Sequence, residues 1–325
     1  MLNKRGSSIS VREGRYFVRN KEQESYIPFH QVKSILLHSA TSLSYEVIAV
    51  AIEHDIDILF IDRKGFPMAR VWSHHFGSIS TIRKNQLAFA QSHEGIRWIK
   101  DVLMKKVNNQ LLVLDLLSII LKSRNQLEAT KNKLNQYIQK LERYEITVKS
   151  EVFASFRGYE GSMSRAYFQQ ISELLPLNYQ FKKRSQHPAY DAFNCLLNYA
   201  YGMLYGYCES ALLKVGIDPH IGVMHRDEYN RPVLVYDFIE LFRHWADYVV
   251  CHLCLQEVIE DDFFEITKEQ YWLNQTGKRI LIQSFNDYLH EIVMIDGLSR
   301  SRIHHLELTA QKLATYLKTF SPLTV

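Results

Sequence analysis

The spacing of apolar residues along the chain changes once, close to residue 77. Between residues 7 and about 72 the apolar residues form short blocks, such as 9–11, 16–18 and 32–37, which are typical of strands. An Arg-Glu-Gly stretch between the first two blocks predicts a hairpin turn. The run YEVIAVAIEH follows Ser44 and has helical spacing, so we expect one capped helix in this region.

Two further strands are expected in DIDILFID and FPMARVW, joined by a turn at Arg63, Lys64 and Gly65. Beyond residue 77 the apolar period lies between three and four, as in KNKLNQYIQKLERYE and HHLELTAQKLATYLKTF. The sequence therefore predicts an α+β protein. Residues 1–76 would form a small β-rich domain with one helix, and residues 77–325 a larger all-α domain, with the boundary inside 74–80.

Composition agrees with two ordinary folded domains. A chain of 325 residues exceeds the size at which a single core usually stops growing. The apolar share of 46% and the charged share of 23% are close to the averages for globular proteins. We find neither an apolar leader nor a run long enough to span a bilayer, so we expect a cytoplasmic protein without membrane contact.

The four cysteines favour a reducing compartment. Cys251 and Cys254 form a CxxC motif, but it lies in an apolar helical run without the further ligands that a zinc site needs, so buried thiols are the better interpretation. The formal charge of +4 favours polyanionic partners only weakly.

Two segments carry candidate chemistry. Glu160 lies between glycines in GYEG, just before an apolar helical run, and its carboxylate alone could be explained as an acid near a helix start. His225 ends a loop, and the helix that follows is expected to begin near Asp237. Asp237, Glu240 and Arg243 are spaced by three residues and would share one helical face.

That face could be a solvated set of ion pairs, but apolar and aromatic residues flank it on both sides. Burial is therefore the better interpretation, and buried carboxylates require protons, partners or a cation. Two carboxylates and one imidazole suit Mg²⁺ or Mn²⁺. Such a metal can polarise a phosphodiester, and the identity of the attacking hydroxyl, water or a DNA 3′ end, separates a nuclease from a strand-transfer enzyme.

Together these segments resemble the CRISPR adaptation integrases, the family of Cas protein one. Four stretches carry the resemblance: GYEG, HPAYDAFNCLLNYAYGMLYGYCESALLKVGIDPHIGVMH, RPVLVYDFIELFR and LSYEVIAVAIEHDIDILFIDRKG. The resemblance implies metal ligands at Glu160, His225 and Glu240, with Asp237 as a neighbouring acidic catalytic residue. Family members can have aspartate where Glu240 stands, and many have proline where Leu241 stands.

The resemblance also implies the activity: insertion of short foreign DNA into a CRISPR array, with DNA 3′-hydroxyls attacking phosphodiesters at the repeat. It further implies a homodimer formed through the β-rich domain and a complex with Cas protein two. A metal-dependent nuclease of branched DNA remains an alternative within enzymes, and a non-catalytic DNA-binding subunit is an alternative of another class.

Basic residues near the acidic segments are candidates for binding DNA phosphates. Single basic clusters are equally common on solvated surfaces, so each assignment needs structural support. Arg184 is the first choice because the family is basic in that stretch. The full candidate set is Arg165, Lys182, Lys183, Arg184 and Arg243.

Overall fold

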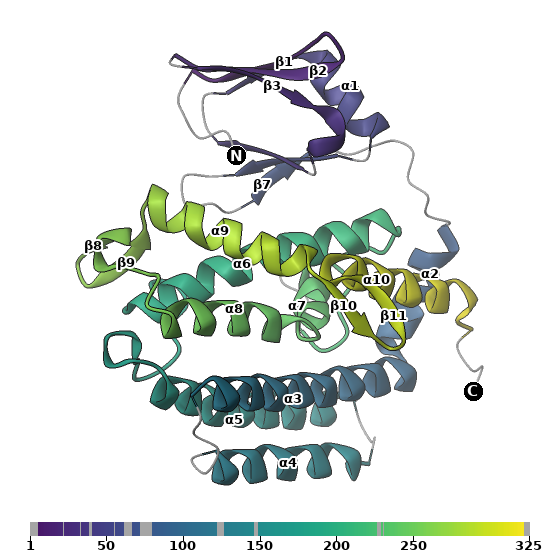
Figure 1. Ribbon diagram of the computed structural model, residues 1–325. Coiled ribbons are helices and arrows are strands. Elements are labelled where there is room, and N and C mark those ends of the chain that lie inside the picture. Colours follow the sequence, from purple (N-terminus) through teal and green to yellow (C-terminus); the bar gives the residue numbers. More distant parts are fainter. Residues whose placement is uncertain are drawn as a thin grey trace. The chain divides into compact units, whose positions relative to one another are not determined.

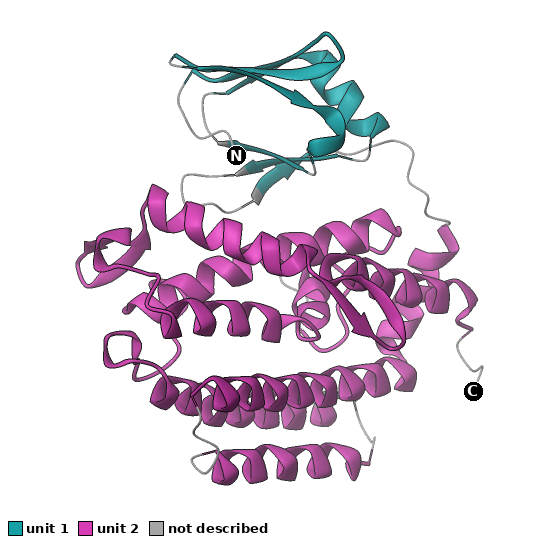
Figure 2. Cartoon of the chain, in the orientation of Figure 1, with its two compact units in different colours: residues 1–76 teal, residues 77–325 magenta. Residues whose placement is uncertain are grey.

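The computed structural model describes residues 6–321, apart from 22, 33, 39–40, 55, 62–66, 72–79, 122–126, 146–148, 226–228 and 230. Contacts within the chain divide it into two compact units, residues 1–76 and 77–325 (Figure 2). The first unit is rich in strands and the second is mostly helical, which confirms the predicted fold class (Figure 1). The turn expected at 63–65 and most of the boundary stretch 74–80 lie outside the described residues.

The described part of the first unit consists of two small sheets, one α-helix and a short 3-10 helix at Phe29–Gln31. One sheet has the order β3-β2-β1-β5 and the other the order β4-β6-β7. The expected hairpin joins β1 to β2, and Glu13 and Gly14 take positive φ angles of 50° and 68° in its turn. The elements are β1 (Ser8–Arg12), β2 (Arg15–Arg19), β3 (Glu24–Pro28), β4 (Ser34–His38), β5 (Ser42–Leu43), α1 (Tyr45–Glu53), β6 (Asp57–Ile61) and β7 (Pro67–Arg70).

This unit has a core of its own, in which Ile9, Tyr16 and Ile58 from the strands meet Val47 and Ala51 from α1. Ser44 takes the expected N-cap position of α1 in an extended conformation, but its side chain makes no capping hydrogen bond. Helix α1 is therefore stabilised mainly by packing its apolar face on the strands.

The second unit consists of helices with two surface hairpins. The helices are α2 (Ser80–Gln91), α3 (His93–Leu121), α4 (Glu128–Glu142), α5 (Lys149–Leu174), α6 (Ala192–Lys214), α7 (Val233–Ile239), α8 (Arg243–Leu255), α9 (Gln275–His290) and α10 (Arg302–Thr319). The hairpins are β8 (Phe264–Thr267) with β9 (Gln270–Leu273), and β10 (Ile292–Ile295) with β11 (Leu298–Ser301). The apolar period did not predict these hairpins because most of their side chains are exposed, so no alternating buried stripe marks them.

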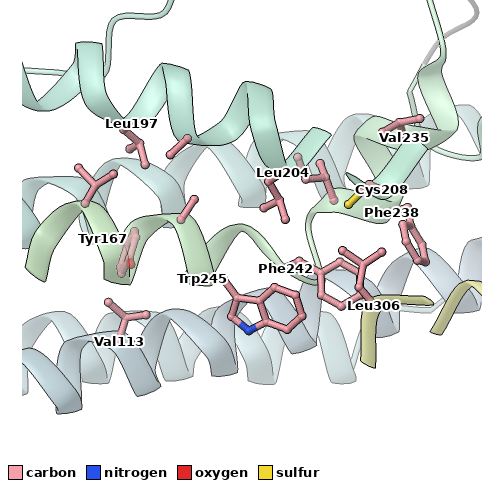
Figure 3. Packing of buried hydrophobic residues seen from close by; sticks show 14 of the residues in the cluster. Val113, Tyr167, Leu197, Leu204, Cys208, Val235, Phe238, Phe242, Trp245 and Leu306 are labelled. Atoms are coloured by element: carbon pink, nitrogen blue, oxygen red, sulfur yellow. The ribbon is translucent and has the colours of Figure 1, made fainter. Parts of the chain in front are cut away.

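The core of this unit lies between α3, α5, α6 and the α7–α8 segment: α3 packs on α5, α7 and α8, and α6 packs on α7 and α8. Figure 3 shows Val113 of α3 and Tyr167 of α5 facing the same interior as Leu204 of α6 and Trp245 of α8. Each fully buried large apolar side chain contributes about 1.5–3 kcal/mol, so this packing fixes how the helices meet. None of the helices that the structure describes has the length and apolar character needed to cross a membrane.

Two of the expected helix starts are wrong in position. Glu160 does not lie near a helix start, because α5 begins at Lys149 and runs through both glycines of GYEG. Buried Phe156, Met163 and Tyr167 continue one apolar stripe along that helix, and their packing outweighs the low helix propensity of glycine. The helix expected near Asp237 begins four residues earlier, at Val233, since Pro232 before it suits a helix start.

Candidate metal centre

Two of the predicted ligands, Glu160 and Glu240, meet at a lysine from a third segment of the chain. Glu160 comes from the middle of α5, Glu240 is the C-cap residue directly after α7, and Lys106 lies on α3. The Lys106 Nζ atom lies 2.7 Å from Glu160 Oε1 and 2.6 Å from Glu240 Oε2. The two carboxylates therefore share one ammonium group.

Glu240 is the more buried of the two acids, with only 3% of its side chain exposed. Its Oε1 atom accepts a hydrogen bond of 2.7 Å from Arg243 Nε. Its Oε2 atom is buried and forms an ion pair with the Lys106 ammonium, whose Nζ atom lies 2.6 Å away. A buried carboxylate needs such positively charged partners to remain ionised.

Charge pairing, not burial, sets the ionisation of this cluster. Burial alone would raise the pKa of Glu240, but the charges of Arg243 and Lys106 lower it to about 2. Burial likewise disfavours the ammonium of Lys106, yet the charges of Glu240 and Glu160 raise its pKa above the ordinary value. Near neutral pH, Glu240 and Lys106 are therefore both charged.

Asp237 is fully buried, and its carboxylate accepts hydrogen bonds from the loop that carries His225. Its Oδ2 atom accepts backbone hydrogen bonds from Val223 (2.8 Å) and Met224 (3.1 Å). Its Oδ1 atom lies 2.6 Å from His225 Nδ1 and 3.3 Å from the backbone nitrogen of His225. Because the carboxylate can only accept, Nδ1 carries the proton, and Nε2 of the neutral imidazole is left with a lone pair for another partner.

The same contact affects the titration of His225. Burial alone would lower the pKa of its imidazole, but the hydrogen bond and the charge of Asp237 raise it above the ordinary value. One third of the side chain is exposed. His225 is thus fixed by Asp237 on one side and open on the other.

The predicted ligands do not form a ready-made metal cluster. Within the described ranges of the chain, no group of three or more His, Cys, Asp or Glu side chains could hold a metal ion as it stands. Lys106 lies between Glu160 and Glu240, and the Nδ1 atom of His225 is taken by Asp237.

A cavity of about 400 Å³ adjoins the two carboxylates. Its walls include Phe168, Phe181 and Tyr201. All five basic residues proposed to contact DNA also line it: Arg165, Lys182, Lys183, Arg184 and Arg243. The cavity therefore joins the acidic residues to a surface of opposite charge.

These five cations differ in what they contact. Arg165, Lys182 and Lys183 are exposed. Arg184, by contrast, donates to Asn194 and Asn198, and its guanidinium lies 5.2 Å from the ring centre of Phe168. Burial lowers the pKa of Arg184, as expected for a cation used inside the fold.

Arg243 is likewise committed within the fold. It pairs with Glu240, and its guanidinium lies 4.6 Å above the ring of Tyr201. Arg184 and Arg243 therefore hold the site together, and the exposed group is better placed to meet a phosphate.

Two residues of the centre were not predicted. Lys106 continues the buried stripe of α3 that includes Leu103 and Val107, so a lysine at an apolar position was the signal. Asp247 of α8 is also buried, and accepts hydrogen bonds from Tyr201 (2.6 Å) and Tyr167 (3.1 Å). Its signal was a carboxylate within the apolar run WADYVV.

Carboxylates and cations around one cavity, together with an imidazole held by an aspartate, are the groups used by metal-dependent enzymes that act on nucleic-acid phosphodiesters. The family model described as CRISPR associated protein Cas1 matches residues 1–287, and the chain belongs to that family.

Two relatives match nearly end to end. A protein of Archaeoglobus fulgidus named CRISPR-associated endonuclease Cas1 1 is 25% identical over 96% of this chain and 94% of its own length. A protein of Thermus thermophilus with the same name is 26% identical over 97% of this chain and 95% of its own length. The resemblance seen in the sequence is thus confirmed over almost the whole chain.

Solved structures share the fold. A casposase bound to integration product superposes with a TM-score of 0.82 at 22% identity, covering 100% of this chain and 94% of its own. A CAS1 protein from Thermotoga maritima gives a TM-score of 0.81 at 20% identity, covering 100% of this chain and 98% of its own.

Proposed function

We propose that this protein is a metal-dependent DNA endonuclease and integrase. It inserts short foreign DNA into a CRISPR array by transesterification from DNA 3′-hydroxyls. Membership of the family, relatives named endonucleases, and a fold shared with a casposase bound to integration product support the proposal. The observation that carries it is the meeting of Glu160 and Glu240 at one cation, beside a cavity lined by basic residues.

The residues that would hold the metal are Glu160, His225 and Glu240. The donor set fits Mg²⁺ or Mn²⁺, and its imidazole shifts the preference towards Mn²⁺. The Glu240 carboxylate, which is already paired with an ammonium, and the partly exposed imidazole of His225 support a cation here. When bound, the metal polarises the scissile phosphodiester and orients the attacking hydroxyl.

Asp237 acts in this proposal by positioning His225. It already receives the imidazole Nδ1–H and two backbone amides of the preceding loop, so it fixes both the tautomer and the direction of the ring. A direct contact of Asp237 with the metal is not needed for this role.

The basic residues would bind DNA in two ways. Arg165, Lys182 and Lys183 are exposed on the cavity wall and would neutralise phosphates. Arg184 and Arg243 would act mainly through the structure, since their guanidinium groups are engaged by Asn198 and Glu240.

Partners follow from the family. We propose that residues 1–76 mediate a homodimer and that the dimer joins Cas protein two. In support, a solved complex titled Cas6-RT-Cas1--Cas2 contains a chain of this fold, with a TM-score of 0.76 over 96% of this protein and 34% of that longer chain. Light scattering of the full chain and of residues 77–325 tests the dimer: the full chain should be dimeric and the shorter one monomeric.

The activity is tested with a supercoiled plasmid that carries a repeat. The protein, its small partner, Mn²⁺ and a duplex with free 3′-hydroxyls should yield plasmid covalently joined to the duplex. Nicking without joining would favour the alternative, a nuclease of branched DNA that uses water with the same ligands. Blocking the 3′ ends with dideoxynucleotides should abolish joining.

The matched variants are Glu160→Gln and Glu151→Gln, both on α5. Glu160→Gln removes a proposed ligand charge and should abolish joining while DNA binding persists. Glu151 is exposed in the first turn of α5, so its variant should behave as the parent protein does. Full activity of Glu160→Gln would overturn the catalytic assignment and favour a non-catalytic DNA-binding subunit.

A further inference from the structure

Lys106 is an unusual residue for the place it occupies. Among the residues whose burial is described, it is the one buried lysine, and only 6% of its side chain is exposed. Lysine is almost never fully buried unless it is paired, because its ammonium is strongly hydrated in water. The pairing partners here are the two carboxylates proposed to hold the metal.

The geometry places the ammonium where a metal would lie. Nζ is within 2.7 Å of one oxygen from each glutamate. A divalent ion bound to both oxygens would lie between them, at about 2.1 Å from each. The nitrogen and the metal therefore exclude each other from the same space.

The charges point the same way. Glu160 and Glu240 supply two negative charges, and Lys106 and Arg243 supply two positive ones, so the cluster is balanced without a metal. A divalent cation added to this buried cluster would leave an excess of two positive charges if Lys106 stayed in place. Departure of the ammonium reduces that excess.

We propose that Lys106 is an internal substitute for the metal: its ammonium holds Glu160 and Glu240 together until a divalent cation displaces it. The inference rests on the metal ligands given under the proposed function. Binding of metal then competes with the ion pairs of Lys106, and the protein tolerates the buried Glu240 beside Glu160 when no metal is bound.

Displacement would also give the ammonium a new role. Lys106 lines the same cavity as Arg165 and Lys182, where a DNA phosphate would be neutralised. Once released, its ammonium can donate to a phosphate oxygen there. DNA and metal should therefore strengthen the binding of each other, since a coupling between two ligands is reciprocal.

The first test measures Mn²⁺ binding by calorimetry, with the bound ion followed by electron paramagnetic resonance. Lys106→Met should bind Mn²⁺ about tenfold or more tightly than the parent chain, because the competing charge-assisted contacts are gone. Lys106→Gln, which keeps a polar end without charge, should behave in the same direction. The control is Lys105→Met, an exposed neighbour on α3, which should leave the affinity unchanged.

Thermal unfolding supplies a readout that needs no activity. Without metal, Lys106→Met should melt below the parent chain, since the buried Glu240 and the partly exposed Glu160 lose the ammonium that they share. Saturating Mn²⁺ should raise its melting temperature by more than that of the parent chain. If neither Lys106 variant folds even with saturating Mn²⁺, the metal cannot replace the ammonium and the inference is wrong.

The outcomes separate this inference from the proposed function. Suppose that Glu160→Gln abolishes Mn²⁺ binding, but that both Lys106 variants bind Mn²⁺ no more tightly than the parent chain does. The proposed competition between Lys106 and the metal is then wrong, whereas the assignment of the metal ligands still holds. If Glu160→Gln does not weaken Mn²⁺ binding, the assignment of the metal ligands is itself wrong. In the parent chain a short duplex should tighten Mn²⁺ binding about tenfold, and in Lys106→Met this gain should shrink to about threefold or less; an unchanged gain contradicts the role of the released ammonium.

Discussion

Two buried aspartates near the candidate site illustrate how partners decide what a carboxylate does. Asp237 accepts backbone amides and the imidazole of His225, whereas Asp247 accepts two tyrosine hydroxyls. Amides and an imidazole N–H fix a loop and a ring. Hydroxyl partners leave Asp247 deep in the core, where burial raises the pKa of its carboxyl to about 6 despite those bonds.

Asp237→Asn tests the positioning role. The variant loses the charge that holds the imidazole, and Mn²⁺ affinity should fall by about 10–100-fold, the effect usual for a partner behind a ligating histidine. Metal titration measures this. Asp218→Asn, in the loop that leads to His225, is the control and should leave the affinity unchanged because Asp218 Oδ1 contacts His220.

Asp247→Asn tests the raised pKa. A carboxyl whose pKa rises from 3.8 to about 6 on folding favours the folded state below pH 3.8, and that contribution is lost as the pH rises through 6. Relative to the variant, the parent chain should lose stability on the order of 3 kcal/mol between pH 4 and pH 7. Urea unfolding at several pH values measures the difference. A difference that stays constant across this pH range would contradict the shift.

At the scale of elements, the site depends on irregular points in otherwise regular helices. Helix α7 ends at Ile239 and α8 starts at Arg243, so Glu240 lies at a break and its side chain turns towards α3 and Lys106. Helix α5 continues through two glycines because its buried stripe holds it against α3 and α4. The loop before α7 is packed closely, since a Cβ on Gly222 would meet Val233 Cγ2 at 2.9 Å.

A pair of glycine variants separates these two situations. Gly158 in α5 has nothing within 4 Å of an added Cβ, so Gly158→Ala should stabilise the protein by about 0.5–1 kcal/mol. Gly222→Ala should destabilise it by about 1–3 kcal/mol, because stiff Val233 and the backbone oxygen of His225 cannot give way freely. Chemical unfolding measures both, and equal effects would contradict the packing of the loop.

For the molecule as a whole, the formal charge of +4 is too small to explain DNA binding by itself. What matters is that cations from separate segments gather on the wall of one cavity beside the acidic residues. Local density, rather than total charge, provides attraction for a phosphate backbone.

The salt dependence of DNA binding tests this distribution. Lys182→Met with Lys183→Met should reduce the slope of log K against log salt concentration by about 0.9 for each duplex phosphate that the two lysines no longer neutralise. Arg184→Met should instead lower the melting temperature, because Arg184 donates to Asn194 and Asn198 inside the fold. Fluorescence anisotropy at several salt concentrations and thermal unfolding measure the two effects, and an unchanged slope in the double variant would contradict the assignment.

The apolar period by itself determined much about this protein: a β-rich segment first, a helical segment second, and the burial of the stretch that carries Asp237 and Glu240. Those features are local, because strand and helix periods are written in neighbouring residues. The helix starts predicted near Glu160 and Asp237 were wrong. Packing extends α5 back to Lys149, and a proline places the start of α7 at Val233.

Only the tertiary structure decided which groups meet. Lys106 and Glu160 are 54 positions apart, and no local pattern places one beside the other. Their contact depends on how α3 packs against α5, and that packing is the sum of many apolar contacts spread over both helices. The sequence could name the acids, but the ammonium between them required the fold, because long-range contacts follow from the arrangement of whole helices.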